Sequence, residues 1–255
     1  MYAIRLPMLV LVTACSHELA TSAGIELASV SPDVACNDAD SNVALSGSHF
    51  TPMPSHTLDT PRLLLPQVTL ITETGAAIEI ADDPDDPGAS RVHWSSETAM
   101  SFDVTRADAL PTGVFDIAVT NPDGDAAVLD RALAIVEAPI VTLPTGICDG
   151  GADQAVVVSG SGFLVYGAAV PTVAIAGPAT TKTFVPSLLT GCAPVSGAFA
   201  EHVQLCTAMT VAIPQGELAA ITSTSVTLVV TNPAPADCAS NPAFHVTVET
   251  APCRG

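Results

Sequence analysis

Three blocks of sequence occur twice in this chain, in the same order and offset by roughly 110 residues, which is about the length of one β-sandwich domain. Self-similarity at a fixed period indicates structural repeats. The pairs are Asn42-Val-Ala-Leu-Ser-Gly-Ser-His-Phe50 with Gln154-Ala-Val-Val-Val-Ser-Gly-Ser-Gly-Phe163, Thr98-Ala-Met-Ser-Phe-Asp-Val104 with Thr207-Ala-Met-Thr-Val-Ala-Ile213, and Phe115-Asp-Ile-Ala-Val-Thr-Asn-Pro122 with Val226-Thr-Leu-Val-Val-Thr-Asn-Pro233. We therefore expect a duplication of one folded unit.

The repeated blocks have the pattern of β-strands. In residues 115–120 apolar side chains alternate with Asp, Ala and Thr, the period of two that indicates a half-buried strand. Asn121-Pro-Asp-Gly124 is typical of a turn, because proline presets φ and glycine accepts positive φ. Residues 126–136 then return as the partner strand, and Gly-Ser-x-Phe is expected to end a strand and place its aromatic ring on the core. Regularly spaced short strands with turn signals favour β-sandwiches.

These motifs occur twice in the same order. Together they resemble the IPT/TIG domain, an immunoglobulin-like module found in plexins, some transcription factors and many bacterial surface proteins. The Ser-Gly-Ser-x-Phe corner and the Val-Thr-Asn-Pro-Asp-Gly hairpin carry the resemblance. It implies an all-β fold of two tandem immunoglobulin-like β-sandwiches, over residues 25–137 and 138–255. The second copy departs from the pattern at Ala234-Pro-Ala-Asp-Cys238 and in an insertion around Thr190–Cys206.

The start of the chain predicts export. A single charge, Arg5, precedes an apolar run over residues 6–14, the layout of a secretory signal that is too short to span a bilayer. Val12-Thr-Ala-Cys15 resembles the bacterial lipobox, which implies cleavage after residue 14 and lipidation of Cys15. Residues 15–24 would then tether the first sandwich to the bacterial cell envelope. Ser16 after the cysteine favours the outer membrane over the inner one if the source is Gram-negative.

Six cysteines remain when Cys15 is set aside, and an even number in an exported chain predicts three disulfides. Metal ligation is the alternative, but the sequence has no CxxC or HxxxH pair. With the sandwich topology that the resemblance implies, Cys192 and Cys206 would staple one loop beside the next strand. The remaining expected pairs are Cys148 with Cys253, at one end of the second sandwich, and Cys36 with Cys238, across the domain junction.

Charge and motifs exclude several functions. Without Arg5 the chain has 26 acidic and 6 basic side chains, a formal charge of −20, which opposes nucleic-acid binding because that requires Lys and Arg at the phosphates. No GxSxG, HExxH, Walker loop or GxGxxG is present, so an enzyme is not expected. Trp94 and Tyr166 are the candidates for a sugar-stacking platform, although core packing is favoured for Trp94.

One acidic loop is the candidate metal site. It holds four carboxylates, Asp82, Asp83, Asp85 and Asp86, that could present oxygen ligands to Ca²⁺. It lacks the register of the helix-loop-helix calcium site, so a solvated loop without a cofactor is the favoured interpretation.

These observations together predict a non-enzymatic exported lipoprotein. Its partners would be the membrane, through the N-terminal lipid, and an envelope or surface protein or glycan. Its tandem modules would serve as a structural, adhesion or protein-interaction unit, including as a subunit of an envelope complex. The alternative is a carbohydrate-binding or Ca²⁺-binding module of the envelope.

Overall fold

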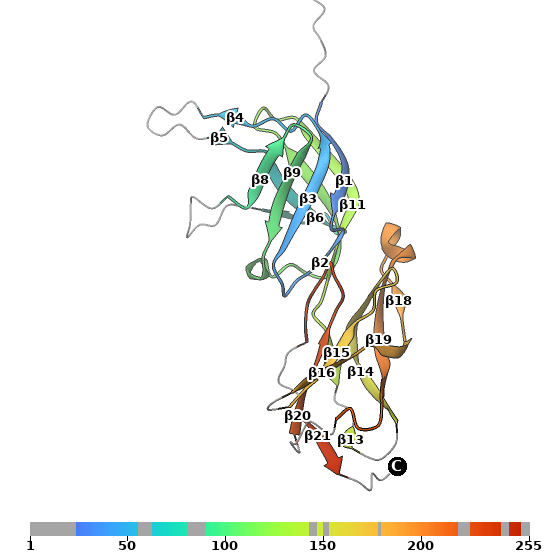
Figure 1. The fold of residues 1–255 in the computed structure, drawn as a ribbon. Coiled ribbons are helices and arrows are strands. Elements are labelled where there is room, and N and C mark those ends of the chain that lie inside the picture. Colours follow the sequence, from blue (N-terminus) through green and yellow to red (C-terminus); the bar gives the residue numbers. More distant parts are fainter. Residues whose placement is uncertain are drawn as a thin grey trace, which may run out of the picture.

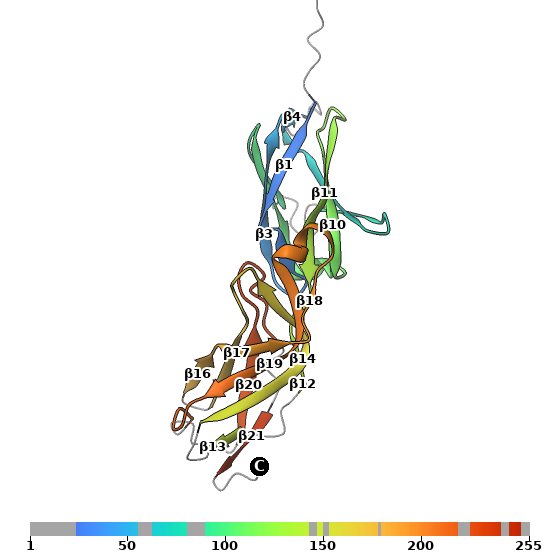
Figure 2. The same ribbon diagram turned by 90° about the vertical axis from the view of Figure 1, so that its right-hand side faces the viewer.

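The computed structural model describes residues 24–55, 63–80, 90–142, 147–149, 153–177, 180–218, 225–240 and 245–250. Within these residues the chain is built of strands, joined by two short 3₁₀ helices, η1 (Arg106–Asp108) and η2 (Gly197–Glu201). No helix in the described ranges has the length and apolar character needed to cross a bilayer. The strands form two sandwiches stacked end to end, as Figures 1 and 2 show.

The first sandwich consists of two main sheets and a two-stranded ribbon. One sheet has the order β1-β3-β9-β8 and the other β2-β11-β10-β6-β7, and the ribbon is β4-β5. The strand bounds are β1 Glu26–Ser31, β2 Val34–Cys36, β3 Ser41–Ser48, β4 Met53–Pro54, β5 Leu63–Leu64, β6 Gln67–Thr72, β7 Ala77–Glu79, β8 Val92–Ser96, β9 Ala99–Val104, β10 Gly113–Thr120 and β11 Ala126–Val136. Inward side chains of both sheets, such as Leu45, Phe102 and Ile117, form one buried core.

The second sandwich repeats this arrangement. Its sheets are β12-β14-β19-β17, with β18 added beside β19, and β13-β21-β20-β15-β16. The bounds are β12 Ile140–Thr142, β13 Ile147–Asp149, β14 Gln154–Tyr166, β15 Thr172–Ala176, β16 Thr181–Phe184, β17 Pro186–Thr190, β18 Ala193–Pro194, β19 Val203–Ile213, β20 Ser225–Thr231 and β21 His245–Thr250. Val158, Met209 and Leu228 are among its core residues.

The strand order is that of an immunoglobulin-like sandwich. β1-β3-β9-β8 and β12-β14-β19-β17 correspond to strands A-B-E-D, while β11-β10-β6 and β21-β20-β15 correspond to G-F-C. In each copy the first strand divides between the sheets: β1 and β12 pair antiparallel in one, and β2 and β13 pair parallel in the other. The predicted all-β fold of tandem immunoglobulin-like sandwiches is confirmed.

A buried asparagine explains why two of the repeated blocks occur together. The Asn121 side chain donates to the carbonyl of His49 (2.8 Å) and accepts from the backbone N–H of Thr51 (3.1 Å). In the second copy Asn232 makes the same two contacts, with the carbonyl of Gly162 and the N–H of Leu164. The Asn of each Thr-Asn-Pro block thus binds the backbone of the Gly-Ser-x-Phe corner. In the second copy both contacts are buried, so Asn232 satisfies polar groups that would otherwise lack partners.

The corner itself differs between the copies. Phe50 and Phe163 are both fully buried, as expected. β3 ends at Ser48, but β14 continues through the corner to Tyr166, so the expectation that this motif ends a strand is wrong in the second copy. The ladder between β14 and β19 absorbs the bend as an irregularity between Ser159 and Phe163.

The predicted turn at residues 121–124 is present. The N–H of Gly124 donates to the carbonyl of Asn121 (2.9 Å), and the N–H of Asp125 donates to the Asp123 carboxylate (3.1 Å). Gly124 has a φ of 97°, which favours glycine. β10 and β11 pair across this turn, so residues 126–136 return as predicted.

Gly160 offers a direct test of the repeated corner. A Cβ added there would collide with the carbonyl oxygen of Ile140 and lie 2.8 Å from the Phe163 ring. We expect Gly160→Ala to lower the free energy of unfolding by about 2 to 3 kcal/mol, because either β12 or the buried ring must move. Urea denaturation monitors the change. Gly24→Ala, where no atom lies within 4 Å of the added Cβ, should leave the midpoint within error, and equal midpoints for both variants would contradict the packing argument.

Candidate functional site: the junction between the sandwiches

An apolar cluster joins the two sandwiches. Its buried members from the first sandwich are Val34, Cys36, Val114, Ala134 and Val136, and those from the second are Leu164, Phe199, Val203, Ala236 and Cys238. The first set lies on the outer face of β2, of the start of β10 and of the end of β11, where the neighbouring residues Ala35, Phe115 and Ile135 point into the core. These strand ends are therefore buried on both faces.

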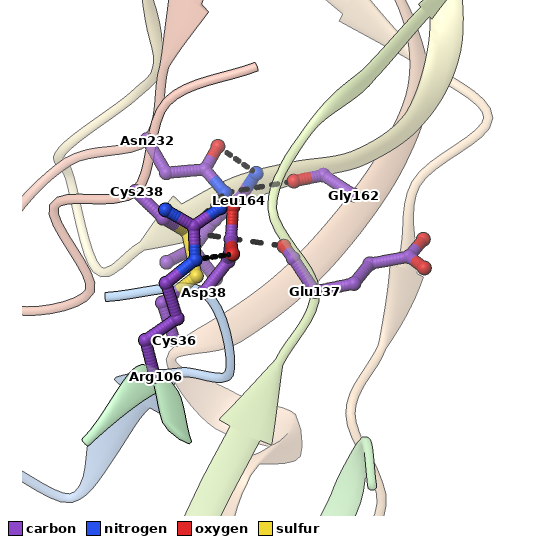
Figure 3. Close-up of a disulfide and its surroundings, with 8 residues drawn as sticks. All are labelled: Cys36, Asp38, Arg106, Glu137, Gly162, Leu164, Asn232 and Cys238. Atoms are coloured by element: carbon purple, nitrogen blue, oxygen red, sulfur yellow. Dashed lines mark hydrogen bonds and ion pairs between the residues drawn. A yellow bond between two sulfur atoms is a disulfide. The ribbon is translucent and has the colours of Figure 1, made fainter. Parts of the chain in front are cut away.

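A disulfide crosses the same junction. Cys36 at the end of β2 is bonded to Cys238, which is 202 residues later in the chain, with the two Cα atoms 6.0 Å apart. Figure 3 shows the bond beside the side chain of Asn232, which bridges Gly162 and Leu164. The crosslink thus joins β2 to the turn that follows β20 in the second sandwich, and the predicted Cys36–Cys238 pair is confirmed.

A polar contact flanks the cluster at Asp33, between β1 and β2. One carboxylate oxygen accepts from the Tyr166 hydroxyl (2.9 Å), and the other lies 2.8 Å from His202 Nε2. The rings of Tyr166 and His202 meet edge to face, with centroids 5.6 Å apart. Burial raises the pKa of Tyr166, and the hydrogen bond to Asp33 and its negative charge raise it further, because both favour the neutral phenol.

Arg131 makes a second polar contact across the junction. It has a φ of 48° at a bulge between β10 and β11, and its N–H donates to the Asp116 carboxylate. Its guanidinium donates to Ser196 of the second sandwich (3.1 Å) and to Glu73 of the first (3.3 Å). The same group lies against Gly197, where an added Cβ would collide with it. The bulge therefore directs Arg131 toward the second sandwich.

Both departures of the second copy from the repeat contribute to this junction. The insertion at residues 190–206 supplies β18 and η2, with Phe199, Ser196 and His202, and the altered turn supplies Ala236 and Cys238. The Cys192–Cys206 disulfide holds the insertion to the start of β19, as predicted. The segments that set the second copy apart are thus the ones that attach it to the first.

A separate polar network lies on the outer face of the first sandwich. Asp103 accepts from the Asn42 amide (2.7 Å), and its other carboxylate oxygen is 2.8 Å from His93 Nε2. Burial alone would raise the pKa of Asp103, but the hydrogen bonds from Asn42 and His93, with the positive charge of His93 and Arg91, bring it below its ordinary value. This face therefore carries a stabilised carboxylate.

The structure separates the residues considered for sugar binding. Trp94 lies on β8, packs against the first core and donates from Nε1 to the carbonyl of Phe50 (2.8 Å). Tyr166 lies at the junction, at the end of β14. The two rings therefore do not form one sugar-stacking platform, and the prediction that Trp94 packs against the core is confirmed.

Several predicted sites lie outside the described residues. These are Cys15, the loop of Asp82, Asp83, Asp85 and Asp86, and Cys253 with its expected pairing to Cys148. In the described part of the chain, no three His, Cys, Asp or Glu side chains gather in a way that could hold a metal ion.

The sequence matches no protein-family model and none of the curated protein sequences. Among solved structures, the chain is similar to DIP-gamma IG1+IG2 (9% identity, 89% of this chain and 97% of that chain, TM-score 0.30). It is also similar to the surface glycan-binding protein PbSGBP-B from Prevotella bryantii (13%, 88% and 41%, 0.29) and to bovine butyrophilin (9%, 87% and 95%, 0.28). The strand order defines the class: an immunoglobulin-like tandem protein with a packed, crosslinked junction.

The contact of Tyr166 with Asp33 can be measured directly, because Tyr2 is the only other tyrosine. In a chain that begins at residue 15, ultraviolet titration should give a tyrosine midpoint above the ordinary value of 10.0. Asp33→Asn should move the midpoint down toward that value, because the nearby negative charge is removed. Since the folded pKa is raised, the contact stabilises the junction fully below pH 10 and loses that effect as the pH rises through the pKa of Tyr166.

Asp38→Asn is the matched control, because Asp38 is exposed and pairs with Arg106. It should leave the tyrosine midpoint unchanged. A midpoint that Asp33→Asn does not lower would show that Asp33 does not act on Tyr166.

Proposed function

We propose that this chain is a non-enzymatic, lipid-anchored protein of the bacterial cell envelope, in which two immunoglobulin-like sandwiches form a rigid rod that presents an interaction surface. The observation that carries the proposal is the junction. Only Glu137–Pro139 separates β11 from β12, and an apolar cluster, a disulfide and two sets of polar contacts span the boundary. A tandem whose function required hinge motion would not need these contacts.

The finer assignment rests on sequence. The Gly-Ser-x-Phe corner and the Thr-Asn-Pro turn support membership of the IPT/TIG type, and the Asn121 and Asn232 contacts give that pair of motifs a common structural reason. The acidic charge favours a protein or glycan partner over a nucleic acid. The lipobox resemblance at Val12–Cys15 supports the anchor.

The anchor predicts a covalent lipid on Cys15. When the chain is expressed in a bacterium fed an alkyne fatty acid, the wild type should take up the label and fractionate with membranes. Cys15→Ser should lose the label completely, because the thioether cannot form. The pair Cys36→Ser with Cys238→Ser should keep it, and label that persists in Cys15→Ser would exclude this anchor.

Rigidity predicts that both sandwiches tumble as one body. ¹⁵N relaxation of the chain from residue 15 should fit a single anisotropic rotational diffusion tensor. In a background of Cys36→Ser and Cys238→Ser, Arg131→Ala should weaken the coupling between the correlation times of the two sandwiches, because the crosslink and the bridge to Ser196 are both lost while the apolar cluster remains.

Arg106→Ala in the same background is the control, since Arg106 pairs with Asp38 inside the first sandwich. It should leave the two correlation times coupled. Two independent correlation times in the wild-type chain would refute the rigid rod.

A further inference from the structure

One sheet of the second sandwich carries no charged residue. The strands β12, β14, β19 and β17 contain no Asp, Glu, Lys, Arg or His, although the whole chain has 26 acidic residues and a formal charge of −19. The side of this sheet that faces away from the core is called the neutral face below. In so acidic a chain, an uncharged sheet surface is a distinct feature.

The strand register fixes which side chains form the centre of the neutral face. Val157 on β14 is opposite Thr210 on β19, and Thr210 is opposite Leu188 on β17. Val157 is 54% exposed and Leu188 is 56% exposed. The flanking row is Thr142, Ser159, Ala208 and Thr190. All these side chains are uncharged, and Val157 and Leu188 place two exposed apolar groups at the centre of the face.

The first sandwich has a different surface at the equivalent positions. The repeat alignment and the register match Asn42, Asp103 and His93 with Ala155, Ala212 and Leu188. In the first copy these three residues form the network around the Asp103 carboxylate, and in the second copy no member of the set is polar. The fold alone therefore does not require the apolar character of the neutral face.

We propose that the neutral face binds the neutral face of a second copy of this chain, to form a two-fold symmetric dimer. Two chains with this net charge repel each other at most approaches, and the neutral face is where they can pack without bringing carboxylates together. The contact is self-complementary, as a two-fold interface requires, and two sheet faces can pack in the aligned manner of a β-sandwich.

The position of the neutral face also suits the proposed lipid anchor. Only this arrangement at a membrane depends on the proposed function. The neutral face lies along the side of the rod, away from the end at which β1 begins (Figure 2). A two-fold axis along the rod therefore leaves both N-termini at the same end, so both could enter one membrane. Confinement to a membrane raises the effective concentration of the second copy, which favours a dimer that charge repulsion weakens in dilute solution.

Sedimentation equilibrium tests the dimer without the anchor, on the chain from residue 15 with Cys15→Ser. We expect a reversible monomer–dimer equilibrium whose dissociation constant falls about tenfold between about 0.05 and 0.5 M NaCl, because salt screens the repulsion between like-charged chains. Val157→Asp with Leu188→Asp should abolish the dimer. A monomer at millimolar concentration in both salts, or a dimer that survives these substitutions, overturns the proposal.

Val128→Asp is the matched control, since Val128 is also apolar, 52% exposed and on a strand, but belongs to the first sandwich. It should leave the dissociation constant within about twofold, because the single added charge is screened in the high-salt arm. Circular dichroism and urea midpoints show whether each variant is folded. A self-association that weakens with salt would depend on attraction between opposite charges and would reject the neutral face as the contact. Failure of fatty-acid labelling at Cys15 would leave this solution result unaffected, so the two proposals fail separately.

Discussion

The burial of β2 and the end of β11 on both faces is the constraint on which the arrangement of this molecule depends. Ala35 and Ile135 point into the core of the first sandwich, while Cys36 and Val136 point into the apolar cluster shared with the second. An immunoglobulin-like sheet is ordinarily solvated on its outer face, with polar residues alternating outward. Here that alternation stops where the second sandwich begins, so separating the two sandwiches would expose an apolar surface on each. The disulfide and the contacts of Asp33 and Arg131 surround a boundary that burial already makes favourable.

The first copy keeps the pattern of the repeat, and the second copy carries the changes that cover these apolar surfaces. Both copies keep the corner glycine, the buried phenylalanine and the asparagine that joins the corner to the turn. The second copy alone adds the insertion with η2 and the turn that ends in Cys238. Both additions face the first sandwich, and a second disulfide, Cys192–Cys206, holds the insertion in place. The divergence of the copies therefore has a structural reason at the junction, because a sandwich that repeated the first without change would lack the side chains that fill the cluster.

Much of the fold could be predicted from local pattern, and the junction for the most part could not. Alternation in residues 115–120 and the turn at 121–124 predicted β10 and its return. The sandwich topology implied by the family resemblance predicted two disulfides that the structure contains. The Asp33 contact with His202 joins residues 169 positions apart and leaves no periodic signal in either segment. One signal was available: residues 132–136 form an uninterrupted apolar run, and such a run indicates burial on both faces. His49 (φ 63°) and Gly162 (φ 71°) hold the two corners in the same left-handed conformation, so the residue at this position does not predict that β14 continues through its corner.

Charge placement explains why the two outer faces suit different environments. The pKa of Asp103 on the first sandwich lies below its ordinary value, because Asn42 and His93 hydrogen-bond to the charged carboxylate. Covering that face with another protein would remove water from this carboxylate, and the cost of burying a charge is high unless the partner supplies matching donors. At the equivalent positions of the second sandwich, Ala155, Ala212 and Leu188 carry no such cost. The outer face of the second sandwich can therefore lose its water at a lower cost than that of the first, which is why the proposed contact lies on the second sandwich.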